Sequence, residues 1–169
     1  MHLALVEKGS PSIRQPSDAE VRDAFEAWHG LVFRTAYRIT GNAADAEDVL
    51  QTVFLRLLRR DGSAPTLDQP ESYLRRAAIN VSLTLLAQRH RAKPVPLDEA
   101  LEAPTTEDAE LRLRLRRAIT HLDAKQAEMF ALRYFEGYSN GEIAKLFNIS
   151  AVRVAVTLYR IRQKLQEEV

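Results

Sequence analysis

Residues 139–162 read SNGEIAKLFNISAVRVAVTLYRIR, and this segment carries the strongest structural signal in the chain. Ser139 and Glu142 have the spacing of a capping box, which predicts the start of a short helix. Asn148 tolerates the left-handed backbone that a tight turn needs, and Ser150 predicts the N-cap of a longer helix. A short helix, a turn and a longer helix make up the helix-turn-helix pattern, so the segment predicts a helical DNA-binding unit.

The longer helix, expected from Ala151 to about Gln166, carries two adjacent stripes. The apolar stripe, which we expect to be buried, consists of Val154, Leu158, Ile161 and Leu165. About a quarter turn away lies a polar stripe, which consists of Arg153, Thr157, Arg160 and Lys164. Such a stripe suits phosphates and base edges in the major groove. The competing interpretation is a plain helical hairpin with a solvated face, since caps and apolar stripes occur in any helical bundle.

Helical periodicity extends over the rest of the chain and predicts an all-α fold of two small helical domains. Apolar residues at steps of three and four predict a helix that ends at Gly41-Asn42, a second over about 43–60 and a third over about 70–91. The organisation that we expect is a flexible N-terminal extension over 1–17, a first domain over 18–92, an acidic, proline-containing linker over 93–110 and a second domain over 111–169.

Composition and charge exclude several classes of protein. The 169 residues contain no cysteine, which excludes disulfide scaffolds, thiol nucleophiles and cysteine-ligated metal sites. No apolar run has the length of a membrane span or a secretion signal, so we expect a cytoplasmic protein without a membrane partner. The net charge is only +1, but residues 56–93 hold eight basic and three acidic residues, whereas residues 94–110 hold six acidic residues and no basic one. This block pattern is compatible with a nucleic-acid partner.

Nothing in the sequence indicates an enzyme. Glu26 and His29 form one E-x-x-H pair, but a di-iron helical bundle needs two such pairs and further carboxylates. The other histidines, His2, His90 and His121, have no metal-ligand spacing, and no phosphate-binding glycine loop occurs. We therefore expect no catalytic residue, no metal and no cofactor.

Both halves of the chain resemble one known family. AYRITGN at 36–42, DAEDVLQ at 45–51 and VFLR at 53–56 resemble region 2 of ECF-type (extracytoplasmic-function) RNA polymerase sigma factors, members of the sigma-70 family. ESYLRR at 71–76 and the pair Ile79-Asn80 are similar to the later part of that region. LDAKQAEMFALRYFEGYS at 122–139 and the helix-turn-helix that follows are similar to region 4. The resemblance covers about residues 18–165, with both halves in the family's order.

The resemblance implies a dissociable subunit that directs transcription initiation. Such a subunit docks on the β′ clamp helices and β flap of core RNA polymerase, recognises the −35 and −10 elements of promoter DNA and helps to melt the latter. It places the polymerase-binding residues at Asp45, Glu47, Asp48 and Gln51. It places the −10 contacts at Arg75, Arg76, Asn80, Gln88, Arg89 and Arg91, and the −35 contacts at Ser150, Arg153, Thr157, Arg160 and Lys164. It also admits an anti-sigma factor as a partner.

The chain departs from the family's pattern at several positions. Thr84 and Ala87 stand where the family usually has an acidic residue and an arginine. Residues 153–157 read RVAVT where the family usually has TVKSR, which predicts a weaker grip on phosphates and a different −35 sequence. Tyr73 stands where the family usually has tryptophan, and we expect it to pack in the core.

Two other functions fit the same motif. A conventional helix-turn-helix regulator would bind duplex operator DNA without polymerase, through an N-terminal domain that dimerises or senses a ligand. A structural adaptor would use the last helix to bind protein. Binding to core RNA polymerase discriminates the sigma-factor interpretation from both.

Overall fold

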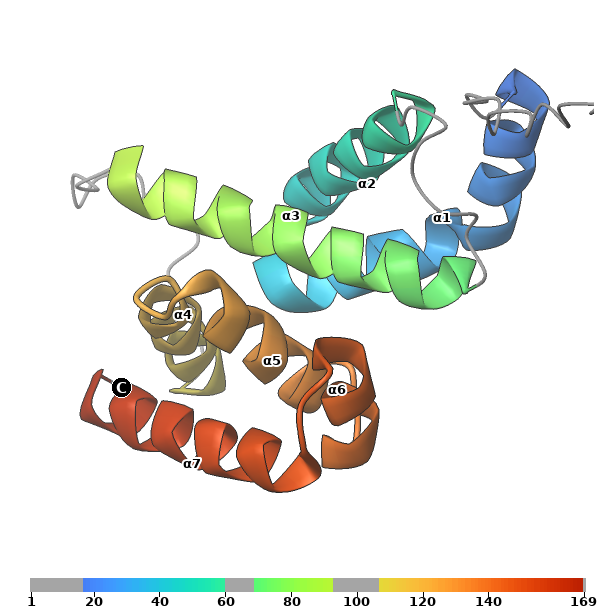
Figure 1. Cartoon of the computed structure of the whole chain (residues 1–169). Coiled ribbons are helices and arrows are strands. Elements are labelled where there is room, and N and C mark those ends of the chain that lie inside the picture. The colour runs from blue at the N-terminus through green and yellow to red at the C-terminus, as the bar shows by residue number, and fades with distance from the viewer. Residues whose placement is uncertain (1–16, 60–68, 93–106, 169) are drawn as a thin grey trace, which may run out of the picture.

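The computed structural model describes residues 17–59, 69–92 and 107–168. These residues form seven α-helices, and no strand occurs in the described ranges (Figure 1). The all-α prediction is therefore confirmed. Residues 1–16 of the predicted extension and residues 93–106 of the predicted linker lie outside the described residues.

Helices α1 (Asp18–Thr40), α2 (Ala43–Leu58) and α3 (Pro70–Ala92) form an N-terminal unit. Ser17 and Glu20 cap α1 with a capping box, and Gly41 ends the helix in left-handed conformation with a φ of 72°. The three helices pack around a shared apolar core whose fully buried members include Val32, Leu74 and Ala78. The helix break predicted at Gly41-Asn42 is confirmed.

Helices α4 (Glu107–Ile119), α5 (Ala124–Tyr134), α6 (Asn140–Phe147) and α7 (Ala151–Glu168) form a C-terminal unit. Ser139 and Glu142 form the predicted capping box of α6, and Asn148 takes the left-handed turn conformation with a φ of 52°. The Arg153 amide donates to Ser150 Oγ at 3.2 Å, so Ser150 caps α7 as predicted. The apolar stripe predicted on α7 is buried throughout. The helix-turn-helix is therefore confirmed.

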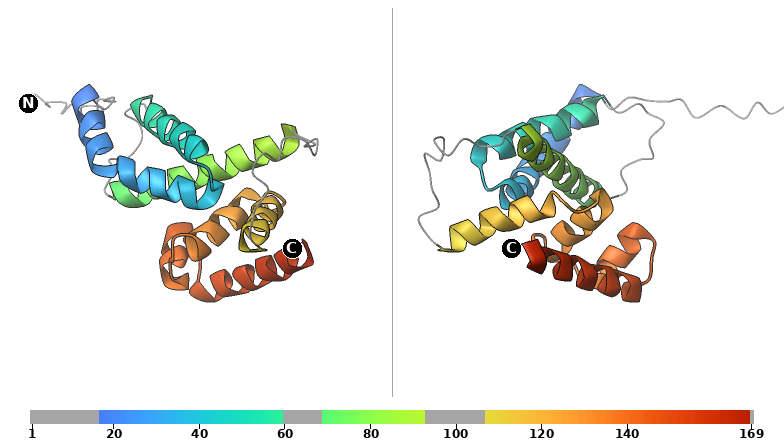
Figure 2. Two further views of the ribbon diagram at one scale, coloured as in Figure 1. Left: turned by 180° about the vertical axis from the view of Figure 1, so that it is seen from behind. Right: turned by 90° about the vertical axis from the view of Figure 1, so that its left-hand side faces the viewer.

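The two units pack directly against each other. Helix α3 crosses over α4 and α5, and α7 lies on the side of the C-terminal unit away from the N-terminal unit, as all views agree (Figures 1 and 2). Ile39 and Ile79 of the N-terminal unit are fully buried in the same cluster as Leu132 and Ile143 of the C-terminal unit. An apolar contact thus joins the units, which sequence analysis treated as separate.

Three details differ from the sequence predictions. Helix α4 begins at Glu107, inside the range assigned to the linker. Phe25 follows Val21 in the apolar periodicity of α1, which predicts burial, but it is 42% exposed and packs its ring edge-on against Phe54 at a centroid distance of 5.0 Å. Tyr73, expected in the core, is 37% exposed, because it lies on the side of α3 away from the buried Leu74 and Ala78.

Within residues 17–59, 69–92 and 107–168, no helix combines the length and apolar character that crossing a membrane requires. The same ranges contain no cluster of three potential metal-ligating side chains. His29 of the E-x-x-H pair stacks on Phe25, and its Nδ1 lies 2.9 Å from the Phe25 carbonyl oxygen, so the ring has a structural role within α1.

Candidate nucleic-acid interfaces

Helix α7 carries the first candidate interface, on its face away from the C-terminal core. Arg153 and Arg160, two of the predicted −35 residues, are exposed there. Thr157 is half-buried, and its hydroxyl donates to the Arg153 carbonyl at 2.8 Å. Lys164 Nζ donates to the His121 carbonyl at 3.0 Å, which holds this cation against the turn between α4 and α5. The predicted polar stripe therefore divides into two exposed arginines and two residues engaged in local contacts.

Sequence reasoning missed an apolar part of the same face. Val152, Val156 and Tyr159 are all exposed, and Val152 is 74% exposed. Their positions i, i+4 and i+7 place them on one face of the helix, opposite the buried stripe. The sequence contained this signal, because the same periodicity that predicts the buried stripe predicts what lies opposite.

The second candidate interface is the side of α3 that holds the predicted −10 residues Arg75 and Arg76. The C-terminal unit covers both. Arg75 forms ion pairs with Glu136 and, at 2.7 Å, with Glu71 of its own helix. Arg38 also pairs with Glu136, at 3.1 Å, and the Glu136 side chain is fully buried. Burial lowers the pKa of Arg75, but its bonds to Glu136 and Glu71 outweigh burial and raise it, so the guanidinium stays charged.

Arg76 makes an equivalent contact one position further along α3. Its Nε donates to Glu128 Oε1 at 2.6 Å, and its guanidinium lies 5.1 Å from the centre of the Phe147 ring. Arg75 likewise lies 5.9 Å from the Tyr138 ring. We call Arg75, Arg76, Glu128 and Glu136 the interdomain ion-pair cluster. Because these charges satisfy one another, the two arginines are not available to DNA in this arrangement.

A helix-capping contact also joins the two units. Arg116 Nε donates to the Ile39 carbonyl at 2.8 Å, and this carbonyl belongs to the last turn of α1. A cation at a helix C-terminus is favourable, because the last carbonyls lack helical partners. Burial lowers the pKa of Arg116. Gly41 makes the approach possible, since a Cβ there would lie 2.5 Å from Arg116 Nη2.

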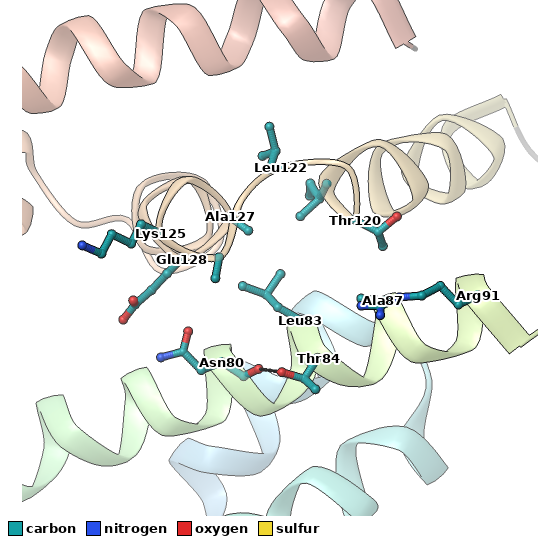
Figure 3. Close-up of a pocket in the computed structure, with 12 residues that line it drawn as sticks. Asn80, Leu83, Thr84, Ala87, Arg91, Thr120, Leu122, Lys125, Ala127 and Glu128 are labelled. Atoms are coloured by element: carbon teal, nitrogen blue, oxygen red, sulfur yellow. Dashed lines mark hydrogen bonds between the residues drawn. The ribbon is translucent and has the colours of Figure 1, made fainter.

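The remaining predicted −10 residues lie further along α3. Asn80 and Arg91 line a pocket of about 490 Å³ between α3 and the α4–α5 corner, where Asn80 lies across from Glu128 (Figure 3). Gln88 is exposed. Arg89 forms an ion pair with Asp45 at the start of α2. The structure thus brings Arg75, Arg76, Asn80 and Arg91 to the interface between the units and leaves Gln88 and Arg89 outside it.

The predicted polymerase-binding residues occupy helix α2. Glu47, Asp48 and Gln51 are exposed, but Asp45 is buried. Burial raises the pKa of the Asp45 carboxyl more than the neighbouring Arg89 lowers it. Asp45, one of the four predicted polymerase-binding residues, is thus buried and paired inside the unit, unlike the other three. Its position at the start of α2, paired with the end of α3, is not readable from local spacing.

Two apolar residues extend the exposed face of α2. Leu55 and Leu58 are 49% and 38% exposed and follow Gln51 at helical spacing. The apolar pair Leu57-Leu58 continues the periodicity that predicts burial in this helix, yet Leu58 points outward, and Leu55 lies outside that periodicity. The face therefore begins acidic and ends apolar, a combination suited to a protein partner.

Comparisons with known proteins match both units to regions of one family. The family model for sigma-70 region 2 matches residues 24–92, and the model for sigma-70 region 4 matches residues 112–165. The RNA polymerase sigma-E factor of Streptomyces coelicolor is 31% identical over 140 residues, which cover 81% of this chain and 78% of that protein. The RNA polymerase sigma factor CarQ of Myxococcus xanthus is 32% identical over 158 residues, which cover 86% and 89%. A solved RsbN–BldN complex contains a chain that matches at 23% identity with a TM-score of 0.35, covering 90% of this chain and 94% of that one.

Proposed function

The chain belongs to the sigma-70 family as an ECF-type RNA polymerase sigma factor, and on this premise we propose how its surfaces divide the work of initiation. Helix α2 docks on core polymerase, α3 contacts the −10 element, and α7 contacts the −35 element. The relatives favour this function over that of a conventional operator-binding regulator. The protein acts in the cytoplasm and contributes no catalytic group of its own, and an anti-sigma factor stays a predicted partner.

The exposed face of α2 supports the docking role. Glu47, Asp48 and Gln51 lead into Leu55 and Leu58 on one side of the helix. Partly apolar surface with charged residues at its edge is typical of a protein interface. Charge reversal at Asp48 therefore weakens binding to core polymerase without unfolding the unit, because the side chain is exposed.

The interdomain ion-pair cluster occupies two of the predicted −10 residues. Arg75 and Arg76 cannot hold a DNA strand while Glu136 and Glu128 hold them. We infer that the free protein occupies a closed form and that the units separate when the protein binds polymerase. In the closed form the carboxylates of Glu136 and Glu128 bind Arg75 and Arg76, which contact DNA phosphates after the units separate.

Transcription by a reconstituted holoenzyme tests this assignment. Purified chain is mixed with core RNA polymerase, and promoter-specific initiation is measured together with affinity for the core. Asp48→Lys should lower the affinity for core at least tenfold with an unchanged circular-dichroism spectrum, and Asp23→Lys, on the exposed side of α1, is the matched control. Undiminished affinity of Asp48→Lys for core would contradict the docking role of α2.

Duplex binding without polymerase separates a sigma factor from a conventional operator-binding regulator. We expect weak binding of the isolated chain to duplex promoter DNA, because the net charge is +1 and two of the arginines are paired in the closed form. Tight, sequence-specific binding at physiological salt in the absence of core polymerase would favour the operator-binding regulator.

A further inference from the structure

The outer face of α7 carries an apolar stripe of three side chains. Val152, Val156 and Tyr159 are 74%, 44% and 62% exposed, although the helix buries four other apolar residues on its opposite face. Single exposed apolar residues are ordinary on a protein surface, whereas a contiguous stripe marks a surface that is covered in a complex. The helix packs on α4, α5 and α6 (Figure 2). The stripe lies opposite the face that it buries there, and therefore faces away from the C-terminal core.

Basic residues border this stripe on both sides. At about 100° per residue, Arg153 and Arg160 lie along one edge of the stripe and Arg162 along the other. Helix α7 has no acidic residue before Glu167. An apolar strip between two basic edges complements the DNA major groove, where base edges form the floor and phosphates form the rims. The same edges disfavour a second copy on this face, since the arginines of both copies would meet.

We propose that Val152 and Val156 read thymine methyl groups in the upstream promoter element. This inference deepens the proposed function and rests on it. A valine cannot hydrogen-bond to a base, and the apolar group that bases present in the major groove is the C5-methyl of thymine. Both residues lie in the first half of the second helix of the helix-turn-helix, the half that contacts base edges.

Helix geometry sets the expected spacing of these thymines. Four residues separate the valines, which is about 6 Å along the helix axis. This length corresponds to about two base-pair steps of 3.4 Å. We therefore expect thymines, on either strand, at two positions one or two steps apart. Arg153 and Arg160 then lie beside the methyl contacts, within reach of a guanine edge or a phosphate.

Deoxyuridine substitution tests the proposal, because deoxyuridine differs from thymidine only by the missing methyl group. The full chain is reconstituted with core RNA polymerase, and its upstream element is selected from promoters randomised over that region. Each thymine in the element is then replaced by deoxyuridine, and holoenzyme binding is measured. Loss of one methyl contact lowers the binding constant about fourfold. We expect this loss at one or two positions for the natural chain, and no further loss there for Val152→Ala or Val156→Ala.

Arg160→Ala is the matched control, because loss of an edge cation weakens every template and leaves the deoxyuridine effect in place. A selected element without thymine overturns the proposal, and so does one that tolerates deoxyuridine at every position. An equal loss of core affinity in Val152→Ala and Val156→Ala overturns it by placing polymerase on the stripe. A natural chain that is a dimer and becomes a monomer on Val152→Ala or Val156→Ala also overturns the proposal, because a second copy of the chain would then cover the stripe. If the proposed function itself fails, the natural chain supports no promoter-specific initiation on any template, and the methyl readout falls with it.

Discussion

Helices α3 and α7 were both predicted to contact DNA, yet the structure treats their arginines differently. Arg75 and Arg76 of α3 are half-buried and paired with carboxylates of the other unit. Arg153 and Arg160 are exposed on α7, a helix that lies on the side of the C-terminal unit away from the N-terminal unit (Figure 1). Residue type and helical position thus identify a candidate DNA-binding residue, whereas tertiary placement decides whether its side chain is available to DNA.

The difference has an energetic basis. The Glu136 carboxylate is fully buried and pairs with the largely buried Arg75, so removing it leaves a buried positive charge with less compensation. An exposed arginine interacts mainly with water and is screened by salt. The α3 face therefore needs an input of free energy before it contacts DNA, and the α7 face does not.

Removing Glu136 should have the largest effect. Glu136→Ala leaves Arg75 with only its bond to Glu71 and costs about 3 kcal/mol in the free energy of unfolding. Urea denaturation measures the loss. Glu110→Ala is the matched control, since Glu110 pairs with Arg114 on an exposed helix face and its loss should change the stability far less. Equal losses in both variants would show that the cluster contributes nothing beyond a surface pair.

Gly41→Ala should have the next largest effect, and Gly137→Ala is a close control. Both glycines have left-handed backbone, with φ of 72° and 75°. A Cβ at Gly41 would lie 2.5 Å from Arg116 Nη2, whereas a Cβ at Gly137 meets nothing within 4 Å. Both variants should lose about 1 kcal/mol to backbone strain. Gly41→Ala should lose more, because Arg116 must leave the Ile39 carbonyl, and thermal denaturation of both compares them directly. Identical losses of stability would mean that Arg116 moves away from the new Cβ without destabilising the protein.

The two exposed arginines of α7 should make different contacts with DNA, so their substitution should affect promoter preference differently. Arg153, nearer the helix N-terminus, is the candidate base reader, so Arg153→Ala should cost about 1–3 kcal/mol and relax the preference at one base pair. Arg160→Ala should weaken all promoters alike, as expected of a phosphate contact. Transcription from a panel of single-base −35 variants measures both. If Arg153→Ala lowers every template by the same factor, Arg153 does not read a base.

The smallest expected effect is the pH dependence due to Asp45. Its raised pKa means that the folded state binds this proton more tightly than the unfolded state. Stability therefore falls as the pH rises from about 4, the ordinary pKa of aspartate, through the raised value. Asp45→Asn should remove this part of the pH profile. Arg89→Gln should make it steeper, because Arg89 lowers the pKa of Asp45. Urea denaturation between pH 4 and pH 7 measures both effects. Coincident pH profiles for the natural chain and Asp45→Asn would contradict this.

Local signals predicted the helices and the helix-turn-helix, because caps, turns and periodicity act within a few residues. Ser139, Asn148 and Ser150 take the roles that their spacing predicted. The interface between the units was not predictable in this way. Arg75 bonds to a carboxylate that is 61 residues away in the sequence, and Arg76 bonds to a carboxylate that is 52 residues away. Helical periodicity relates only residues a few positions apart, so it cannot predict such pairs. The exposure of Leu55 and Leu58 depends in the same way on how α2 packs against α1 and α3.

The distance between the units before and after polymerase binding tests the central claim most directly. The chain has no cysteine, so Asp23→Cys on α1 and Gln166→Cys on α7 provide two unique exposed labelling sites for energy transfer. A second pair, Lys125→Cys and Gln166→Cys, lies within the C-terminal unit and controls for dye effects. We predict that transfer between α1 and α7 falls markedly when core RNA polymerase is added to the free protein, and that transfer within the control pair does not change. Transfer that stays constant when core polymerase binds would contradict the closed form and its opening.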